Sequence, residues 1–295
     1  MKASNQKLNI NDLSSFAKNK INDFGYVSIE NYFSKEQLND FEQAVIDLYL
    51  LQAKKIGEYR DKAITIENSN MSNFEKFSSI CEMMEENDKE ALYQVQKYLT
   101  SSLGARSLFD KNFVNLCADI LGSKINSILV DGPALFVNRP NTQRLLYKWH
   151  SEAHYYPKRR KFLNIWLPLF DKKSKSNGTM SFKEKSHTRD FPFSDYQGYN
   201  KDTQNKNNFF VQYEIPSNFL KDYEEHYCNN NPGDLVIFSR SMVHTSNQNM
   251  SDKYSVAVVA RVWDPSDDLT LSGTISATPY GGNIGRSNLI VDSWD

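Results

Sequence analysis

The second half of the chain consists of short apolar segments separated by turn signals, and this pattern constrains the fold more than any other feature. Turns such as Asn177-Gly178 and Pro232-Gly233-Asp234 separate several of these segments. Many short strands joined in this way predict an antiparallel β-sandwich or barrel. The strand candidates span residues 125–130, 134–137, 145–155, 162–169, 235–238 and 256–263.

The first half, residues 7–121, has apolar side chains at helical spacing. Ser34 and Gln37 form a capping-box pattern, which predicts the start of a helix. Residues 73–99 and 108–121 also have helical patterns, and Gly122 ends the second. We therefore expect a mainly β fold with helical additions in a single domain, 1–295. Its parts are a helical region over about 1–124, a β core over about 125–265 and a C-terminal tail over 266–295.

A long polar insertion interrupts the predicted β core over residues 186–231. Long segments of this kind in a compact domain often act as lids over a binding site. Its aromatic residues, among them Phe191, Phe193 and Tyr213, either stack on a ring-containing substrate or pack the lid down. The sequence alone leaves both interpretations open.

Charge and composition exclude several functional classes. The formal net charge is -1, and the basic run at residues 158–161 is too short to indicate nucleic-acid binding. No apolar stretch approaches the roughly 18 residues that a membrane span requires, and the first residues lack the apolar core of a signal peptide. The three cysteines are far apart, which argues against a disulfide framework or a zinc ribbon. We expect a cytoplasmic protein that acts on a small molecule, with no nucleic-acid or membrane partner and with its oligomeric state left open.

A histidine and a carboxylate two residues apart point to a metal site. If residues 145–155 form a strand, His150, Glu152 and His154 lie on one face, so His150 and Glu152 converge on one point. The third ligand is expected on a distant strand, and His244 fits because it follows a turn and an apolar strand at 235–238. Two imidazoles and one carboxylate suit Fe(II) and leave coordination positions open for a cosubstrate and O2. We expect His154 to contact the substrate, support a ligand or pack, rather than to bind the metal.

The motifs around these residues resemble the phytanoyl-CoA dioxygenase family of Fe(II)/2-oxoglutarate-dependent oxygenases. The block from Trp149 to Pro157 is similar to the first iron motif of that family. Asn177-Gly178-Thr179-Met180 resembles a conserved turn, and the segment from Pro232 to Asn249 resembles the second iron motif. The resemblance implies a double-stranded β-helix, Fe(II) bound by His150, Glu152 and His244, and 2-oxoglutarate and O2 as cosubstrates. It also implies release of succinate and CO2.

The sequence departs from the family at two positions. Glu152 stands where aspartate is usual, and because a carboxylate is retained, hydroxylation is favoured over halogenation. Ser255 stands where the resemblance implies the arginine that anchors 2-oxoglutarate. Arg261 lies on the same predicted strand face as Ser255, so it either binds that carboxylate or pairs with a nearby acid. The other candidate 2-oxoglutarate-binding residues are Ser246, which the resemblance implies, and Gln143, Arg144 and Lys148 before the first ligand.

Two other functions remain open on the sequence alone. In a cupin-like isomerase or 2-oxoglutarate-independent dioxygenase, His154 would be a fourth ligand beside His150, Glu152 and His244. A non-catalytic barrel that binds a small molecule without metal is the other. The family resemblance favours a dioxygenase that hydroxylates a small molecule, whose identity the sequence does not indicate.

Overall fold

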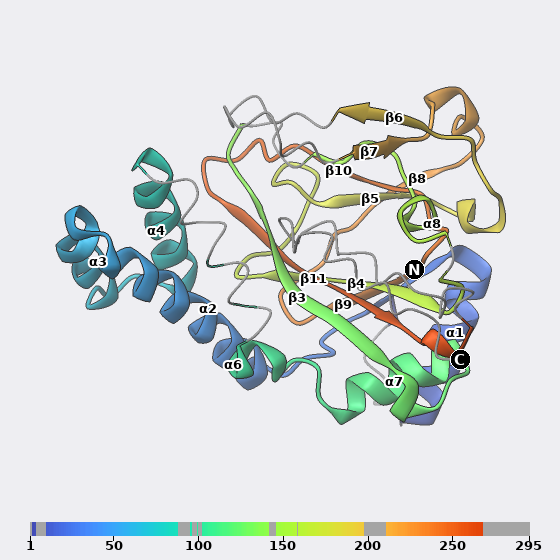
Figure 1. Ribbon diagram of the computed structural model, residues 1–295, viewed down its shortest axis with the longest axis horizontal. Helices are drawn as coiled ribbons and strands as arrows, with labels where there is room; N and C mark the ends of the chain where they lie inside the picture. The colour runs from blue at the N-terminus through green and yellow to red at the C-terminus, as the bar shows by residue number, and fades with distance from the viewer. Residues whose placement is uncertain are drawn as a thin grey trace, which may run out of the picture.

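A layer of helices from the first half of the chain packs against a β-sheet from the second half (Figure 1). The computed structural model describes residues 2–3, 10–87, 95, 99, 102–141, 146–157, 159–197 and 211–267. The helices are α1 (Ile10–Phe24), α2 (Lys35–Lys55), α3 (Arg60–Glu67), α4 (Asn73–Asn87), α6 (Leu103–Arg106), α7 (Lys111–Leu121) and the single turn α8 (Glu152–Tyr155). Among the described residues, no helix combines the length and apolar character needed to cross a membrane.

The helix signals read from the sequence correspond to real caps. The Ser34 hydroxyl accepts a hydrogen bond from the Gln37 backbone, and the Gln37 side chain accepts one from the Ser34 backbone. This reciprocal pair satisfies two of the backbone donors that the start of a helix leaves free. Gly122 ends α7 in the left-handed conformation, where glycine carries no steric penalty. The helix start predicted at Ser34 and the helix end predicted at Gly122 are therefore both confirmed.

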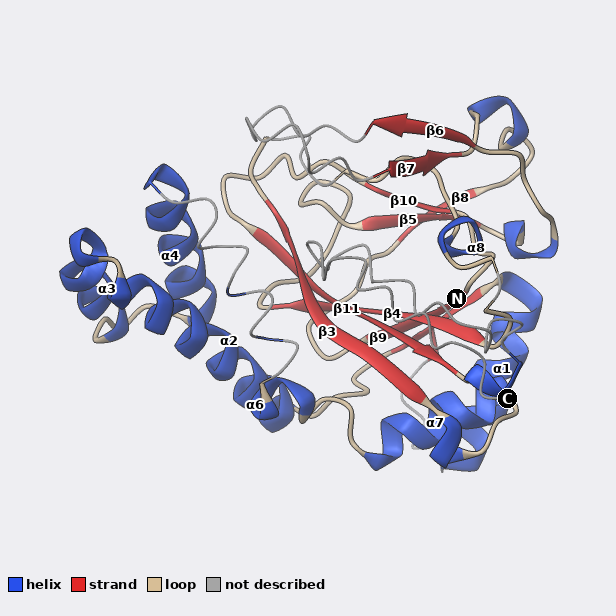
Figure 2. Cartoon of the chain, viewed as in Figure 1, coloured by secondary structure: helices blue, strands red, loops and turns tan. Residues whose placement is uncertain are grey.

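Eleven strands occur in the described part of the chain, arranged in two facing sheets and a separate pair (Figure 2). The large sheet has the order β1-β2-β9-β4-β11-β3, the small sheet the order β10-β5-β8, and β6 pairs with β7. The bounds are β1 (Lys2–Ala3), β2 (Tyr26–Ile29), β3 (Leu129–Asn138), β4 (Phe162–Leu169), β5 (Met180–Lys183), β6 (Ser194–Gln197), β7 (Val211–Glu214), β8 (Glu225–Tyr227), β9 (Leu235–Ser239), β10 (His244–Ser246) and β11 (Ser255–Trp263). The predicted antiparallel sandwich is thus present.

The central strands of the large sheet are buried on both faces, so their sequences are almost continuously apolar. Side chains alternate along each strand. In β4, Leu163, Ile165 and Leu167 join the core shared with the helices, whereas Trp166 belongs to a second core between the two sheets. The large sheet therefore separates a structural core on one side from the interior of the sandwich on the other.

Several predicted boundaries need correction. The two strands expected at 125–130 and 134–137 are a 3-10 turn followed by one strand, β3. β3 continues past Gly132 and Pro133 because its pairing with β11 shifts register there, and such a bulge accommodates a proline, which has no N–H to donate. The predicted lid, 186–231, contains β8, which pairs with β5 in the small sheet. The predicted tail lies outside the described residues from residue 268 onward.

Candidate metal centre

His150 and His244 face each other across an isolated antiparallel bridge. The backbone N–H of each donates to the carbonyl of the other, at 3.0 and 2.9 Å. Their rings stand 4.2 Å apart between centroids, and both side chains are buried. Since backbone pairing fixes both residues, the two imidazoles are held side by side by the fold itself.

Hydrogen bonds set the tautomer of both rings. His150 Nδ1 lies 2.6 Å from the Lys148 carbonyl, and His244 Nδ1 lies 3.0 Å from the Met242 carbonyl. A carbonyl oxygen only accepts, so Nδ1 carries the proton in each ring and Nε2 keeps its lone pair. Burial lowers the pKa of His150 to about 3, and the neighbouring His244 adds to this shift. Burial also lowers the pKa of His244 to about 4. Both rings are therefore neutral at physiological pH, as an imidazole that binds a metal must be.

Glu152 reaches the same point from a different backbone conformation than the sequence predicted. The expected strand at 145–155 is wrong over its described residues, because Glu152 begins the helical turn α8 and its carbonyl accepts from the Tyr156 N–H at 2.9 Å. Short segments carry too little periodicity to separate a strand from a helical turn. His154 consequently does not share the face of His150, and its ring stacks on Phe193 at 4.2 Å instead.

The three predicted ligands nevertheless come together. One nitrogen from each of His150 and His244 and one Glu152 carboxylate oxygen all lie within 4.8 Å of one another. Glu152 Oε1 is 3.5 Å from Arg261 Nη2, while Oε2 is buried with no hydrogen-bond partner among the described residues. A buried carboxylate oxygen without a partner is costly, and a metal ion at this point would satisfy it. The donor set of two neutral nitrogens and one carboxylate fits Fe(II).

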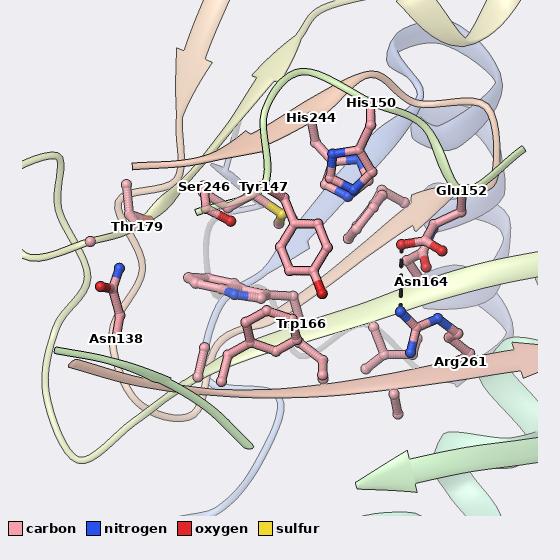
Figure 3. Close-up of a pocket in the computed structure, with 18 of the residues that line it drawn as sticks. Asn138, Tyr147, His150, Glu152, Asn164, Trp166, Thr179, His244, Ser246 and Arg261 are labelled. Atoms are coloured by element: carbon pink, nitrogen blue, oxygen red, sulfur yellow. Dashed lines mark ion pairs between the residues drawn. The ribbon is translucent and has the colours of Figure 1, made fainter. Parts of the chain in front are cut away.

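A pocket between the two sheets extends from these ligands (Figure 3). Arg261 and Asn164 lie on the Glu152 side, and Asn138 and Thr179 lie at the opposite end. The stretch between them is largely aromatic and apolar, with Phe136, Tyr147, Trp166 and Phe238 among its lining residues. Apolar walls with a few polar groups at the ends are typical of a site for a small molecule.

The predicted 2-oxoglutarate-binding residues fall in different places. Ser246 lines the pocket two residues after His244, and Arg261 lines it beside Glu152. Lys148 has a half-exposed side chain that pairs with Glu214 at 2.5 Å, away from the pocket lining. Gln143 and the reserve candidate Arg144 lie outside the described residues. The sequence left two roles open for Arg261, binding the 2-oxoglutarate carboxylate or pairing with a nearby acid. Its ion pair with Glu152 matches the second role.

The described aromatics of the predicted lid pack on one another beside α8. Phe193 contacts Tyr213 as well as His154, and Tyr213 contacts Tyr155. Tyr155 in turn meets the His150 ring edge-on, with 5.7 Å between centroids, and lines the pocket. These aromatics thus support the wall behind His150. Among the residues placed by the structure, the metal-binding group has three members, so the four-ligand cupin arrangement with His154 is not formed.

Several pocket residues were not identified from the sequence. Asn164 and Trp166 are two residues apart on β4, so their side chains lie on the same face of the strand. This alternation is the one sequence pattern that would have predicted that both side chains face the pocket. Tyr147 and Asn138 lie outside any recognised motif, and no local pattern marks them. Lys173, a fully buried lysine after β4, was also missed because a single lysine in a loop normally indicates a solvated side chain.

Comparison with known proteins gives one family and a shared fold. The sequence matches the phytanoyl-CoA dioxygenase (PhyH) family over residues 21–256. Among curated protein sequences, none matches. The non-haem α-ketoglutarate-dependent carbocyclase SnoK from nogalamycin biosynthesis is 16% identical, covering 88% of this chain and 87% of its own, with a TM-score of 0.52.

Two further structures extend this likeness. EctD from S. alaskensis in its apo form is 15% identical, covering 85% of this chain and 76% of its own, with a TM-score of 0.54. It has also been solved with 2-oxoglutarate and 5-hydroxyectoine. EvdO2 from Micromonospora carbonacea var. aurantiaca is 14% identical, covering 90% of this chain and 94% of its own, with a TM-score of 0.54. At these identities the likeness shows a shared fold, which confirms the predicted double-stranded β-helix.

Proposed function

The chain belongs to the phytanoyl-CoA dioxygenase family of iron- and 2-oxoglutarate-dependent oxygenases, and we propose that it hydroxylates a small-molecule substrate. The observation that carries this proposal is the convergence of two neutral imidazoles and one carboxylate at the wall of a pocket between the two sheets. In the overall reaction, one oxygen atom of O2 enters the substrate as a hydroxyl. The other enters succinate, which is formed from 2-oxoglutarate with loss of CO2.

We assign His150 Nε2, His244 Nε2 and a Glu152 carboxylate oxygen as the ligands of Fe(II). Bound iron would couple the reduction of O2 to the oxidation of 2-oxoglutarate and substrate. The carbonyls of Lys148 and Met242 hold the imidazoles with Nε2 toward the pocket. Three protein ligands leave positions open, as a site that binds both a cosubstrate and O2 requires.

The surroundings of the ligands favour oxygenation over simple metal storage. Trp166 and Phe238 line the pocket, so a substrate bound there would replace water against apolar walls. Glu152 occupies the carboxylate position, which leaves no vacancy there for a halide. The hydroxylated compound bound by EctD, a protein of the same fold, supports hydroxylation as the reaction type.

Iron binding and cosubstrate binding test the proposal directly. Purified protein should take up one Fe(II) per chain, and anaerobic addition of 2-oxoglutarate should produce a visible iron-to-cosubstrate charge-transfer band. In the presence of O2, slow formation of succinate without added substrate should follow. Iron uptake without the band would favour a cupin-like enzyme, and absence of iron uptake would favour a metal-free binding protein.

The variant Glu152→Ala should abolish succinate formation, because it removes the only anionic ligand of the three. Its Fe(II) dissociation constant should rise at least about tenfold, since even residues that merely support a ligand cost that much. The control Glu67→Ala removes a half-exposed glutamate paired with Lys54 on the helical layer, and it should behave as the wild type. Full succinate formation by Glu152→Ala would defeat the assignment.

A further inference from the structure

The pocket has a second polar end, away from the proposed iron ligands. Asn138 and Thr179 lie there in Figure 3, and Ser246 stands between this end and His244. Ser255 also lines the pocket, at the start of β11, where it is paired with Asn138 of β3. A molecule that extends from the metal along the pocket would meet these polar side chains last.

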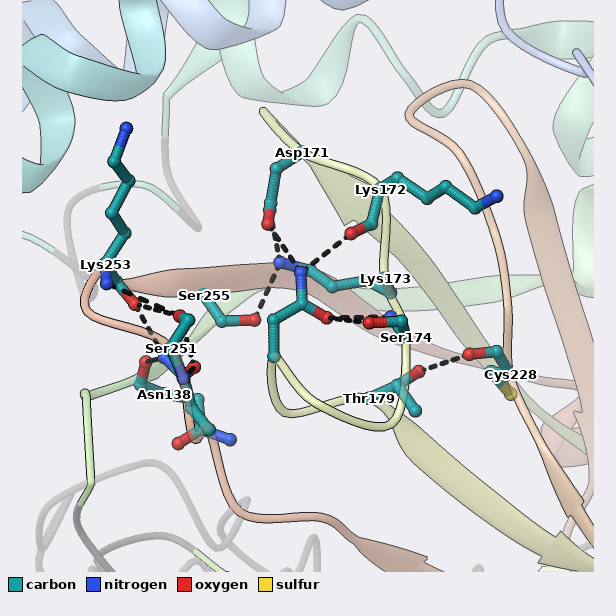
Figure 4. Close-up of polar contacts among 12 residues, drawn as sticks. Asn138, Asp171, Lys172, Lys173, Ser174, Thr179, Cys228, Ser251, Lys253 and Ser255 are labelled. Carbon is teal, nitrogen blue, oxygen red and sulfur yellow. Dashed lines mark hydrogen bonds and ion pairs between the residues drawn. The ribbon is translucent and has the colours of Figure 1, made fainter.

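A buried cation lies directly behind this end (Figure 4). Lys173 is fully buried, and its Nζ donates to Ser255 Oγ at 2.7 Å and to Asp171 Oδ1 at 2.5 Å. Its backbone N–H donates to the Asn230 carbonyl at 2.8 Å, so the loop that carries it is anchored. The Ser255 hydroxyl already accepts from an ammonium group, so its own proton is available to donate into the pocket.

The two partners of Lys173 differ in their exposure to water. The Asp171 side chain is 22% exposed, whereas the Lys173 side chain is 1% exposed and Ser255 is buried. Solvent screens a partly exposed carboxylate, but a charge that enters the buried pocket near Ser255 is screened much less. Burial lowers the pKa of Lys173 against the opposing effect of Asp171, so a second anion would further stabilise the ammonium.

Arg261 is placed too near the metal ligands to serve this end. It stands six residues after Ser255 on β11, and its guanidinium lies 3.5 Å from Glu152. A dicarboxylate that binds the metal through its oxo-acid end would extend away from Glu152 with its other carboxylate. In Figure 3, Ser246 lies on the way from Glu152 to Asn138, and Asn138 is the strand partner of Ser255.

We propose that Lys173, acting through the Ser255 hydroxyl, anchors the far carboxylate of 2-oxoglutarate. The proposal rests on the proposed function and names the group that replaces the arginine absent at position 255. Ser255 is the residue in contact with the carboxylate, and Lys173 is the positioning cation behind it. The pair supplies one charge-assisted hydrogen bond in place of the two that a guanidinium would give.

The test compares two ligands that differ only in the far carboxylate. Anaerobic calorimetry of the Fe(II)-loaded protein would measure dissociation constants for 2-oxoglutarate and for 2-oxopentanoate, which has a methyl group at that end. The wild type should prefer 2-oxoglutarate by at least about tenfold. Lys173→Met should remove most of this preference by weakening 2-oxoglutarate alone, whereas Lys172→Met, an exposed neighbour, should leave it intact.

Two further variants keep the test decisive if Lys173→Met does not fold. The double variant Lys173→Met/Asp171→Asn removes both charges of the pair, so no unpaired buried charge remains, and it should show the same loss of preference. Asp171→Asn alone should tighten 2-oxoglutarate binding several-fold, because Lys173 then has one anion fewer to satisfy. A preference retained in the double variant overturns the role of Lys173, whereas a wild type that binds neither oxo acid overturns the proposed function itself.

Discussion

Arg261 is a buried cation beside the buried Glu152 and the partly buried Asp131. Its guanidinium lies 3.5 Å from Glu152, and both side chains are 8% exposed. Asp131 is its register partner across β3, and burial raises the pKa of Asp131 while Arg261 and Arg159 lower it. The arginine therefore offsets the cost of keeping the Glu152 carboxylate, a proposed metal ligand, away from water.

Replacing Arg261 by methionine should destabilise the metal-free protein by about 3–5 kcal/mol at pH 7, because it leaves the buried Glu152 carboxylate without its ion-pair partner. The folded-state pKa of Asp131, which burial already raises, would then rise further above its unfolded value, because one of its two nearby arginines is gone. Acids with raised pKa values destabilise the fold above the unfolded pKa, so the deficit should shrink as the pH falls from 7 toward 5. Urea unfolding at pH 7 and at pH 5 measures this loss of stability.

Two additions to the Arg261→Met experiment separate charge from packing. Mn(II), added in place of Fe(II), should recover part of the lost stability because it would supply a cation next to Glu152. The preference for 2-oxoglutarate over 2-oxopentanoate should survive, since we attribute it to Lys173. An equal loss of stability at both pH values would mean that Arg261 acts by packing instead.

At the scale of elements, Gly25 packs against Met242, which lies just before the strand β10 that carries His244. It joins α1 to β2 with φ of +89°, and an added Cβ would lie 2.4 Å from Met242 Sδ and 2.7 Å from His187 Nδ1. The carbonyl of Met242 accepts the hydrogen bond that orients His244. A side chain at residue 25 therefore pushes on a residue that positions a proposed iron ligand.

Gly25→Ala should lower the free energy of unfolding by about 1–3 kcal/mol through backbone strain and overpacking. It should also weaken Mn(II) binding in the fraction that folds, because Met242 must move. Gly57→Ala is the matched control, since an added Cβ there meets nothing within 4 Å. Thermal unfolding with and without Mn(II) gives both quantities, and a stable Gly25→Ala protein with unchanged metal affinity would contradict the coupling.

Helices and strands could be predicted where burial requires a regular pattern of apolar residues. They could not be predicted where the backbone conformation depends on a single short turn. β4 was predicted to the residue, because a strand covered on both faces must be apolar throughout. The pairing of His150 with His244 across distant segments was inferred from residue types, whereas the helical turn at Glu152 was not. No sequence pattern predicts that Lys173 is buried, because its burial depends on how the loop after β4 folds against Ser255.

At the scale of the whole molecule, the large sheet separates the core shared with the helices from the pocket that holds the proposed metal ligands. Leu167 is fully buried in the core shared with the helices, and its neighbour Trp166 lines the pocket on the opposite face. Substitutions at these adjacent residues therefore test the helix-side core and the pocket separately.

Leu167→Ala should cost about 2–5 kcal/mol of stability by opening a cavity, and it should leave 2-oxoglutarate affinity unchanged in the folded protein. Trp166→Phe should cost less stability, because the aromatic ring is partly retained. It should weaken 2-oxoglutarate and 2-oxopentanoate equally, since Trp166 lies between the two polar ends of the pocket in Figure 3. Urea unfolding and anaerobic calorimetry of both variants measure the separation. If Leu167→Ala changed the dissociation constant as much as Trp166→Phe does, the sheet would transmit packing defects to the site, and the two halves would not be independent.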